Sequence, residues 1–178
     1  MDIDQIKALR NNKIKDDQGA WDKVLKLRAL TKYDFKYKGY LSFKNFKKIL
    51  EWKYEGQDNR VEKILALSPV SLIESITRCY SEIDHPNEDL KTRIKTYILL
   101  GIPWIGIGMA SAIMGLHEPD KYAGIDKSIR ATIFQEEVRT LQAKDYLPYL
   151  KRIKEIAGQL DCDLQETEYL LKLMQDPD

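Results

Sequence analysis

The amino-acid sequence predicts an all-α protein, and three observations point to this fold class. Apolar residues recur three and four positions apart in almost every periodic segment, the spacing that places them on one face of a helix. Gly and Pro stand at the breaks between these segments. The chain of 178 residues is 43% hydrophobic, which suits one domain, or two small helical lobes that share a core. We expect residues 1–178 to form a single helical domain.

Each expected helix follows from an apolar periodicity and from the residues that flank it. Ser42 is predicted to cap the third helix and Gly56 to end it. Ser68 is the predicted cap of the fifth helix, with Pro69 at its first helical position. We expect helices at about residues 3–15, 20–32, 43–52, 59–66, 70–80, 87–100, 109–116, 127–138, 146–158 and 164–174.

The N-terminal segment 1–40 consists of two predicted helices and the first part of a basic, aromatic stretch. This stretch, residues 31–48, departs from the helical pattern. Tyr33, Phe35 and Tyr37 alternate with polar residues, which predicts a short strand or a loop over the core. Asp34 is the only acid of this stretch, against six lysines. By contrast, residues 158–178 hold six acids and one lysine. The charges are therefore polarised along the chain, and we expect one basic face.

The overall charge excludes attraction to nucleic acid by the field of the whole molecule. The net charge is +1, from 29 basic and 28 acidic residues, so any nucleic-acid face must be local. Cys79 and Cys162 lie far apart, without the spacing of metal ligands. We expect two free, buried thiols in a reducing compartment, and neither a metal site nor a cofactor.

The N-terminal residues argue against export. Asp2 and Asp4 stand where a signal peptide needs positive charge. No apolar run reaches the roughly 18 residues of a membrane-spanning helix. We expect a cytoplasmic protein that does not act at a membrane.

Residues 102–126 carry the strongest functional signal. Pro103 breaks a helical run, Gly106 and Gly108 turn the chain, and a helix with a small-residue face follows at Ala110, Ser111 and Ala112. A glycine turn before a helix leaves N–H groups free at the positive end of the helix dipole, which suits a phosphate. Glycine also permits positive φ and a close approach of the sugar-phosphate backbone. The turn therefore predicts contacts to DNA phosphates, which position the DNA without reading its base sequence. The alternative is that the glycines only join two packed helices.

This stretch resembles a known superfamily. The residues from Ile102 to Gly106 resemble the Leu-Pro-Gly-Val-Gly hairpin of helix-hairpin-helix DNA glycosylases, and residues 108–113 resemble the helix after it. Residues 119–126 resemble the loop that delivers the essential aspartate of those enzymes. Trp52-Lys53 and the Gly-x-x-x-Ala-Ser-Ala-Ile helix are similar to small uncharacterised prokaryotic members, which lack the catalytic lysine and the iron-sulfur cluster.

The resemblance covers residues 40–175 and implies both a fold and a partner. The implied fold has two helical lobes with a helix-hairpin-helix, residues 87–117, at the cleft between them. The implied partner is double-stranded DNA, without a nucleotide cofactor.

Three departures from the superfamily pattern limit the chemistry. Trp104 replaces the first hairpin glycine, which crowds the turn or offers an aromatic surface to DNA. Gly108 stands where bifunctional members carry the lysine that forms a Schiff base, so lyase activity is not expected. The cluster of four cysteines that follows the closing helices in some members is absent, so no iron-sulfur cofactor is expected.

Asp126 is the candidate catalytic residue. Cleavage of an N-glycosidic bond builds positive charge on the sugar, which one carboxylate stabilises while water attacks. The alternative role is an N-cap, because Asp126 directly precedes a predicted helix. The candidate base pocket, which stacks an extruded base, consists of Trp52, Lys53 and Tyr122. The candidate DNA-contact residues are Trp104, Ile105, Gly106, Ile107, Gly108, Lys127 and Arg130.

The sequence therefore favours a DNA-binding hydrolase of base excision repair, resembling a monofunctional DNA glycosylase. Two alternatives belong to other classes. One is a non-catalytic helix-hairpin-helix DNA-binding module, and the other is a structural or partner-binding helical protein.

Overall fold

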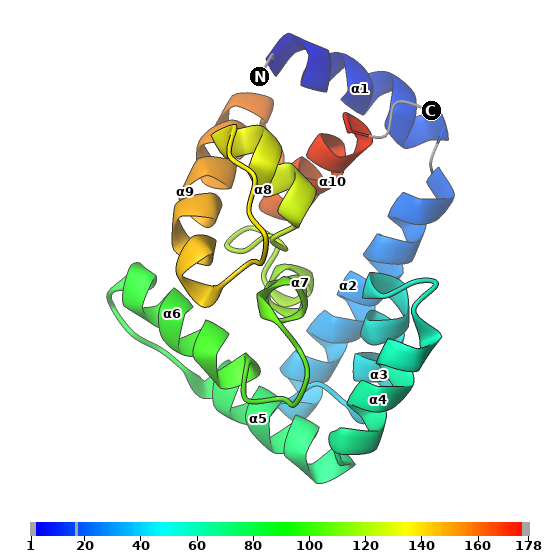
Figure 1. The fold of residues 1–178 in the computed structure, drawn as a ribbon, viewed down its shortest axis with the longest axis vertical. Helices are drawn as coiled ribbons and strands as arrows, with labels where there is room; N and C mark the ends of the chain where they lie inside the picture. Colours follow the sequence, from blue (N-terminus) through cyan, green and yellow to red (C-terminus); the bar gives the residue numbers. More distant parts are fainter. Residues whose placement is uncertain (1–2, 17, 176–178) are drawn as a thin grey trace.

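The computed structural model describes residues 3–16 and 18–175, and these residues form α-helices without any strand, which confirms the all-α class. Figure 1 shows the helices in chain order. They are α1 (Ile3–Asp16), α2 (Gln18–Lys38), α3 (Phe43–Lys53), α4 (Asp58–Leu67), α5 (Val70–Glu82), α6 (Glu88–Leu99), α7 (Ile107–His117), α8 (Lys127–Phe134), α9 (Ala143–Leu160) and α10 (Leu164–Leu173).

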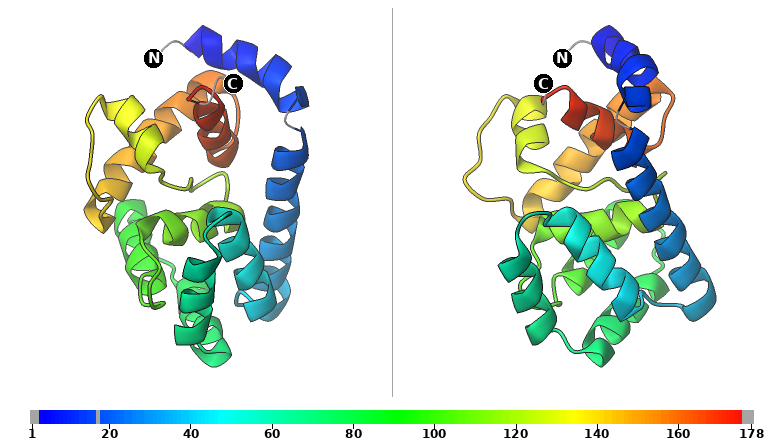
Figure 2. Two further views of the ribbon diagram at one scale, coloured as in Figure 1. Left: turned by 45° about the vertical axis from the view of Figure 1, so that its right-hand side comes forward. Right: turned by 90° about the vertical axis from the view of Figure 1, so that its right-hand side faces the viewer.

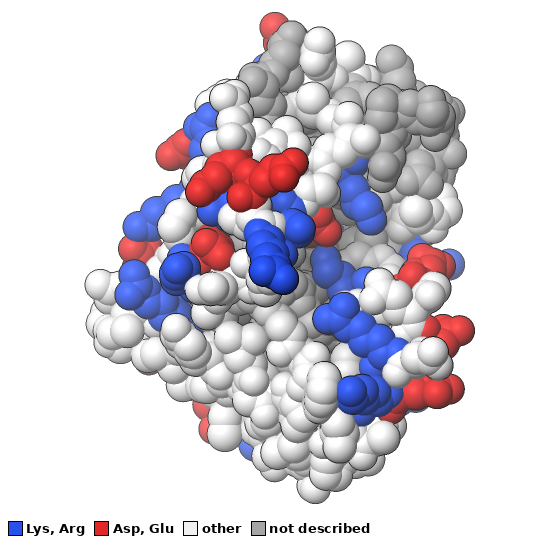
Figure 3. Space-filling model, in the orientation of Figure 1, with Lys and Arg blue, Asp and Glu red and all other residues white. Residues whose placement is uncertain are grey.

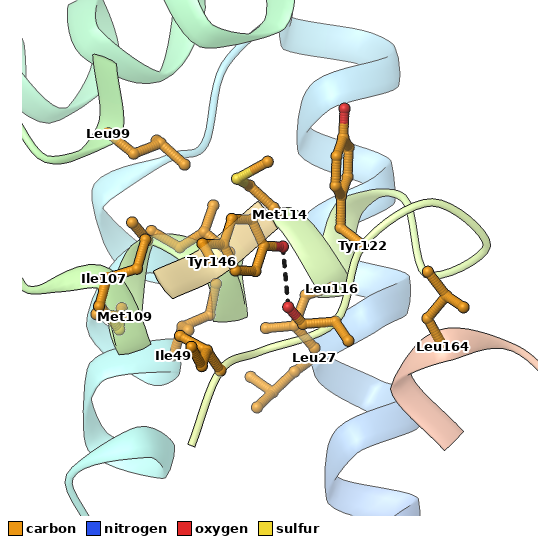
Figure 4. Packing of buried hydrophobic residues seen from close by; sticks show 14 of the residues in the cluster. Leu27, Ile49, Leu99, Ile107, Met109, Met114, Leu116, Tyr122, Tyr146 and Leu164 are labelled. Carbon is orange, nitrogen blue, oxygen red and sulfur yellow. Dashed lines mark hydrogen bonds between the residues drawn. The ribbon is translucent and has the colours of Figure 1, made fainter. Parts of the chain in front are cut away.

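Helix α7 is the centre of the fold. It contacts α2, α3, α6, α9 and α10, and all its residues except Gly108 and His117 are buried. A helix that is apolar on every side has no solvent face to present, so the remaining helices pack around it. Figures 1 and 2 show α1, α8, α9 and α10 on one side of α7 and α3 to α6 on the other, with α2 passing alongside. Figure 4 shows Met114 of α7 packed among Leu99, Tyr122 and Tyr146.

Ser111 and Gly115 of α7 lie against an extended segment, residues 122–125. A Cβ atom added to Gly115 would lie 3.3 Å from the Tyr122 carbonyl oxygen. The Ser111 hydroxyl accepts a hydrogen bond of 2.9 Å from the Ile125 N–H group. Small side chains are therefore needed here because the backbone of another segment approaches α7 closely.

The turn between α6 and α7 differs in detail from the expectation. Helix α7 begins two residues early because Gly106 is extended, with φ −103° and ψ −178°, and serves as its N-cap. Neither glycine has a positive φ, since Gly108 is helical. The positive φ of the turn belongs to Trp104, at +64°. The left-handed region costs a bulky residue roughly 1–2 kcal/mol, so this tryptophan is held in a strained conformation.

The predicted extended segment at Tyr33 to Tyr37 is wrong, because α2 continues to Lys38. Interactions at i,i+4 spacing support the helix here. Asp34 and Lys38 form an ion pair of 2.7 Å, and the rings of Tyr33 and Tyr37 lie 4.8 Å apart on the surface. Phe35 points inward, so the alternation in the sequence does not reflect the two faces of a strand.

Several helix ends and one thiol also differ from expectation. Helix α8 ends at Phe134 and not near residue 138, because Gln135 adopts the left-handed conformation. The N-cap of α5 is Pro69 and not Ser68, one residue later than expected. Ser42 is confirmed as the N-cap of α3, although its hydroxyl donates to Asp34 and accepts no hydrogen bond from the helix. Cys79 is exposed and Cys162 is half-buried, so the prediction of two buried thiols is wrong.

Buried charges connect α6 to the residue that follows α7. Lys95 is 3% exposed, and its Nζ atom donates to Glu118 Oε2 at 2.7 Å. Lys121 donates to the other carboxylate oxygen at 2.8 Å. Burial raises the pKa of Glu118, but the hydrogen bonds from Lys121 and Lys95 outweigh it and hold that pKa at about 2. These charges fasten the start of segment 118–126. None of the described helices is long and apolar enough to cross a membrane.

Candidate nucleic-acid interface and carboxylate site

Asp126 is the N-cap of α8 and is only half-buried. Its Oδ1 atom accepts hydrogen bonds from the Ser128 N–H group at 2.8 Å and from the Ser128 hydroxyl at 2.6 Å. The expectation that it caps this helix is therefore confirmed. Because an N-cap carboxylate lies at the positive end of the helix dipole, this position favours its ionised form.

The segment that carries Asp126 is fixed by hydrogen bonds from three helices. Tyr146 and Tyr149 of α9 donate to the carbonyl oxygens of Ala123 and Gly124, at 2.9 and 3.0 Å. Figure 4 shows the first of these bonds as a dashed line at Tyr146. Ser111 of α7 accepts from the Ile125 N–H group, as described above. Asp126 therefore stands on a rigid support, which is what a reactive group requires.

The third helix is α10, which contributes a second carboxylate, Glu168. Its Oε2 atom accepts a hydrogen bond of 2.7 Å from the Gly124 N–H group. A Cβ atom at Gly124 would lie only 2.8 Å from Oε1, so a larger residue at this position would displace the Glu168 carboxylate. Glu168 is not among the site residues predicted from the sequence. The signal was present, because Glu168 lies on the apolar stripe of α10 between Leu164 and Leu171, where a carboxylate is unusual.

Lys53, at the end of α3, links the two carboxylates electrostatically. Burial raises the pKa of Asp126, but the hydrogen bonds from Ser128 and the positive charge of Lys53 outweigh it, so that pKa lies below its usual value. Burial raises the pKa of Glu168 to about 6, although Lys53 and the Gly124 N–H group oppose the shift. Lys53 of α3, Asp126 before α8 and Glu168 of α10 therefore act on one another electrostatically, and the pKa values of the two acids are shifted in opposite directions.

Only part of the predicted DNA-contact set reaches the surface. Trp104 is 60% exposed and Gly106 is exposed, whereas the side chains of Ile105 and Ile107 are in the core. Gly108 is half-buried, and a Cβ atom there would lie 3.4 Å from the Ile125 carbonyl oxygen. The turn therefore offers its backbone and one indole ring, and no apolar side chain besides Trp104.

The two cations of α8 differ in their availability. Lys127 is exposed. Arg130 is largely buried, and its guanidinium forms ion pairs with Glu136 at 3.3 Å and with Asp145 at 3.7 Å. Arg130 is thus engaged by acids of this chain, and Lys127 is the residue of α8 that is open to a phosphate.

The three base-pocket candidates do not share one cavity. Trp52 and Lys53 are half-buried at the end of α3, where the Lys53 ammonium lies 5.8 Å from the centre of the Trp52 ring. Tyr122 is 1% exposed in the core, and burial raises its pKa to about 12. Tyr122 therefore offers no face to a base in this conformation, whereas Lys53, next to Trp52, acts electrostatically on both carboxylates.

The charged residues around this site are unevenly distributed. Figure 3 shows Lys and Arg side chains near the middle of one face and over α3 and α4, and acidic side chains over α8 and at the edge beside α3 and α4. Figure 1 places the turn between α6 and α7 on the same face. Within the described ranges, no group of His, Cys, Asp and Glu side chains is arranged to hold a metal ion. Basic and acidic side chains are thus interspersed on this face, with cations near its middle.

Replacing Glu168 by Gln is expected to stabilise the protein by about 2 kcal/mol above pH 7, and to change little at pH 4.5 or below. The folded state raises the pKa of Glu168 from 4.5 to about 6. Its contribution to stability is therefore complete below pH 4.5 and is lost as the pH rises through 6. Urea denaturation at pH 4.5 and pH 8 measures the difference. Glu62→Gln, at an exposed position on α4, is the control, and equal stability of E168Q and wild type at pH 8 would contradict the expectation.

No protein family, curated protein or solved structure shows significant similarity to this chain.

Proposed function

We propose that the protein binds double-stranded DNA on the face formed by the α6–α7 turn and the start of α8, and that it removes a base as a monofunctional glycosylase. In this proposal α6, the turn and α7 form a helix-hairpin-helix at the cleft between two lobes. The observation that carries the proposal is the setting of Asp126, a half-buried carboxylate on a rigid segment whose pKa is lowered. Such a group is an anion at neutral pH.

The chemistry follows from that charge. As the N-glycosidic bond breaks, the sugar becomes cationic, and a fixed carboxylate in a partly dry site stabilises this cation strongly. Water then adds to the sugar, and the products are the free base and an abasic site. Gly108 supplies no amine to attack the sugar, so hydrolysis and not Schiff-base formation is the expected route.

The DNA contacts come from backbone groups and one free cation. Gly106 is the N-cap of α7 and has no side chain to cap it. The first N–H groups of this helix are therefore available to a phosphate. Ile107 and Gly108 contribute through their backbone, since Ile107 buries its side chain. The Ile105 side chain is also buried, and its N–H group already donates to the Ile102 carbonyl oxygen at 3.4 Å. Lys127 adds a positive charge beside Asp126.

One observation favours the non-catalytic alternative. Asp126 already caps α8 through two hydrogen bonds with Ser128, and this role requires no chemistry. A DNA-binding module with the same contacts would bind duplexes and leave their bases in place. Incubation of mismatched and damaged duplexes, followed by alkaline cleavage at abasic sites, separates the two functions. Strand cleavage with any of these duplexes supports the glycosylase, whereas binding without cleavage supports the module.

Binding to duplex DNA is expected to weaken linearly on a log–log plot against salt, and Lys127→Ala is expected to reduce the slope by about 1. The reason is that each phosphate contact releases about one counterion. Fluorescence anisotropy with a labelled duplex at several salt concentrations measures the slope. The matched control is Lys36→Ala, because Lys36 is exposed on α2, which Figure 2 shows on the opposite side of the molecule from α8.

A slope unchanged by K127A would remove Lys127 from the interface. A protein that binds no duplex at any salt concentration would instead support the structural or partner-binding alternative, in which the α6–α7 turn only packs helices.

A further inference from the structure

Trp104 forms one wall of a surface pocket between α4 and the α6–α7 turn. The pocket has a volume of about 460 Å³ and is lined by Asn59, Arg60, Lys63, Ile64 and Trp104. Ile64 is buried and forms an apolar base, while the two cations and the amide stand at the exposed positions. The volume falls in the range of sites that hold small organic ligands.

The conformation of Trp104 is unfavourable and is not offset by burial. Its φ of +64° lies in a region that bulky residues avoid, and the side chain remains 60% exposed. Strained residues persist at sites where the strain serves a function, and large apolar side chains are usually buried. A strained and exposed tryptophan at the wall of a pocket therefore indicates a ligand that uses the indole ring.

The cations of the pocket are free of carboxylate partners among the residues that the structure describes. The Lys63 ammonium lies 3.6 Å from the centre of the Trp104 ring. The Arg60 guanidinium lies 4.0 Å from the centre of the Tyr54 ring and bonds weakly to Gln57 at 3.4 Å. Neither charge is neutralised by a carboxylate, so both can pair with an anion, Lys63 by turning from the Trp104 ring toward it.

We propose that this pocket binds an unstacked nucleobase against Trp104, with Lys63 and Arg60 on the adjoining phosphates. An aromatic ring stacks on every type of base, and cations beside it follow the backbone. Asn59 offers an amide that can both donate to and accept from the edge of a base. The inference takes nucleic acid as the ligand from the proposed function and adds a preference for DNA with an unpaired base.

The test compares three labelled DNAs of one sequence: an intact duplex, the duplex with one bulged base, and the same bulge with an abasic site. Wild type is expected to bind the bulged base about tenfold more tightly than either of the other two, since stacking of one base contributes that much or more. Trp104→Gly is expected to abolish the preference. Trp104→Phe is expected to keep most of it, because the ring is retained.

The glycine variant is suitable because glycine adopts positive φ without strain, and thermal unfolding checks that it folds. Tryptophan fluorescence gives a second readout. The bulged DNA should quench the Trp104 part of the emission, so quenching should be smaller in W104F. Inorganic phosphate has no base and should not quench it. Equal binding of the intact and bulged duplexes by wild type, or a preference that survives in W104G, would overturn the pocket and leave the proposed function standing. Failure to bind any of the DNAs would overturn both.

Discussion

Asp126→Asn is expected to lower the rate of base release by about 100-fold or more, because it removes the negative charge that stabilises the cationic sugar. The substitution changes the charge of the side chain and keeps its size. Asn is as good an N-cap as Asp, so the hydrogen bonds that Oδ1 accepts from Ser128 can be kept. Segment 118–126 is also held independently by Tyr146, Tyr149 and Glu168. The loss therefore reports the charge and not the fold.

The measurement is single-turnover release of the base from the best duplex substrate, with anisotropy to show that DNA is still bound. Ser128→Ala is the matched control, because it removes one hydrogen bond to Asp126 and leaves the carboxylate in place. That hydrogen bond lowers the pKa of Asp126, so S128A should move the acid limb of the pH–rate profile upward and change the rate at neutral pH only slightly. If D126N released base at the wild-type rate, Asp126 would be a helix cap alone.

Lys95→Met is expected to have the largest effect on stability, a loss of about 3–5 kcal/mol at neutral pH. The variant leaves the Glu118 carboxylate with only Lys121 as a hydrogen-bonded partner, and Lys121 is 52% exposed. Removal of one member of a buried ion pair is costly because the remaining charge stays away from water. Urea denaturation followed by circular dichroism measures the loss.

The pH dependence identifies the cause of that loss. The folded state lowers the pKa of Glu118 from 4.5 to about 2. Its contribution to stability is therefore present above pH 4.5 and is lost as the pH falls through 2, so wild type and K95M should converge in acid. Lys121→Met is the control and should cost less than about 1 kcal/mol, because its ion pair is exposed to solvent. A K95M protein as stable as wild type at pH 7 would show that the pair contributes nothing net.

The position of Asp126 could be predicted from the sequence, but its surroundings could not. An aspartate directly before a helical periodicity is a local signal, and the structure confirms the cap. Lys53 and Glu168 are 73 and 42 residues away along the chain, and only packing brings their charges to bear on Asp126. Tyr122 shows the reverse case, since the sequence marks it as a pocket aromatic and the fold buries it.

The class of the fold and the main helices were determined by the sequence alone, because helical periodicity, caps and breaks act within a few residues of one another. Asn87, Asp126 and Asp163 each mark a helix start through a hydrogen bond to a nearby N–H group. Tertiary structure decided which way each side chain faces and how far α2 extends. It also placed the positive φ of the turn on Trp104 and not on Gly101 or Gly106, since the path of the chain between the buried Ile102 and Ile105 depends on packing and not on local preference.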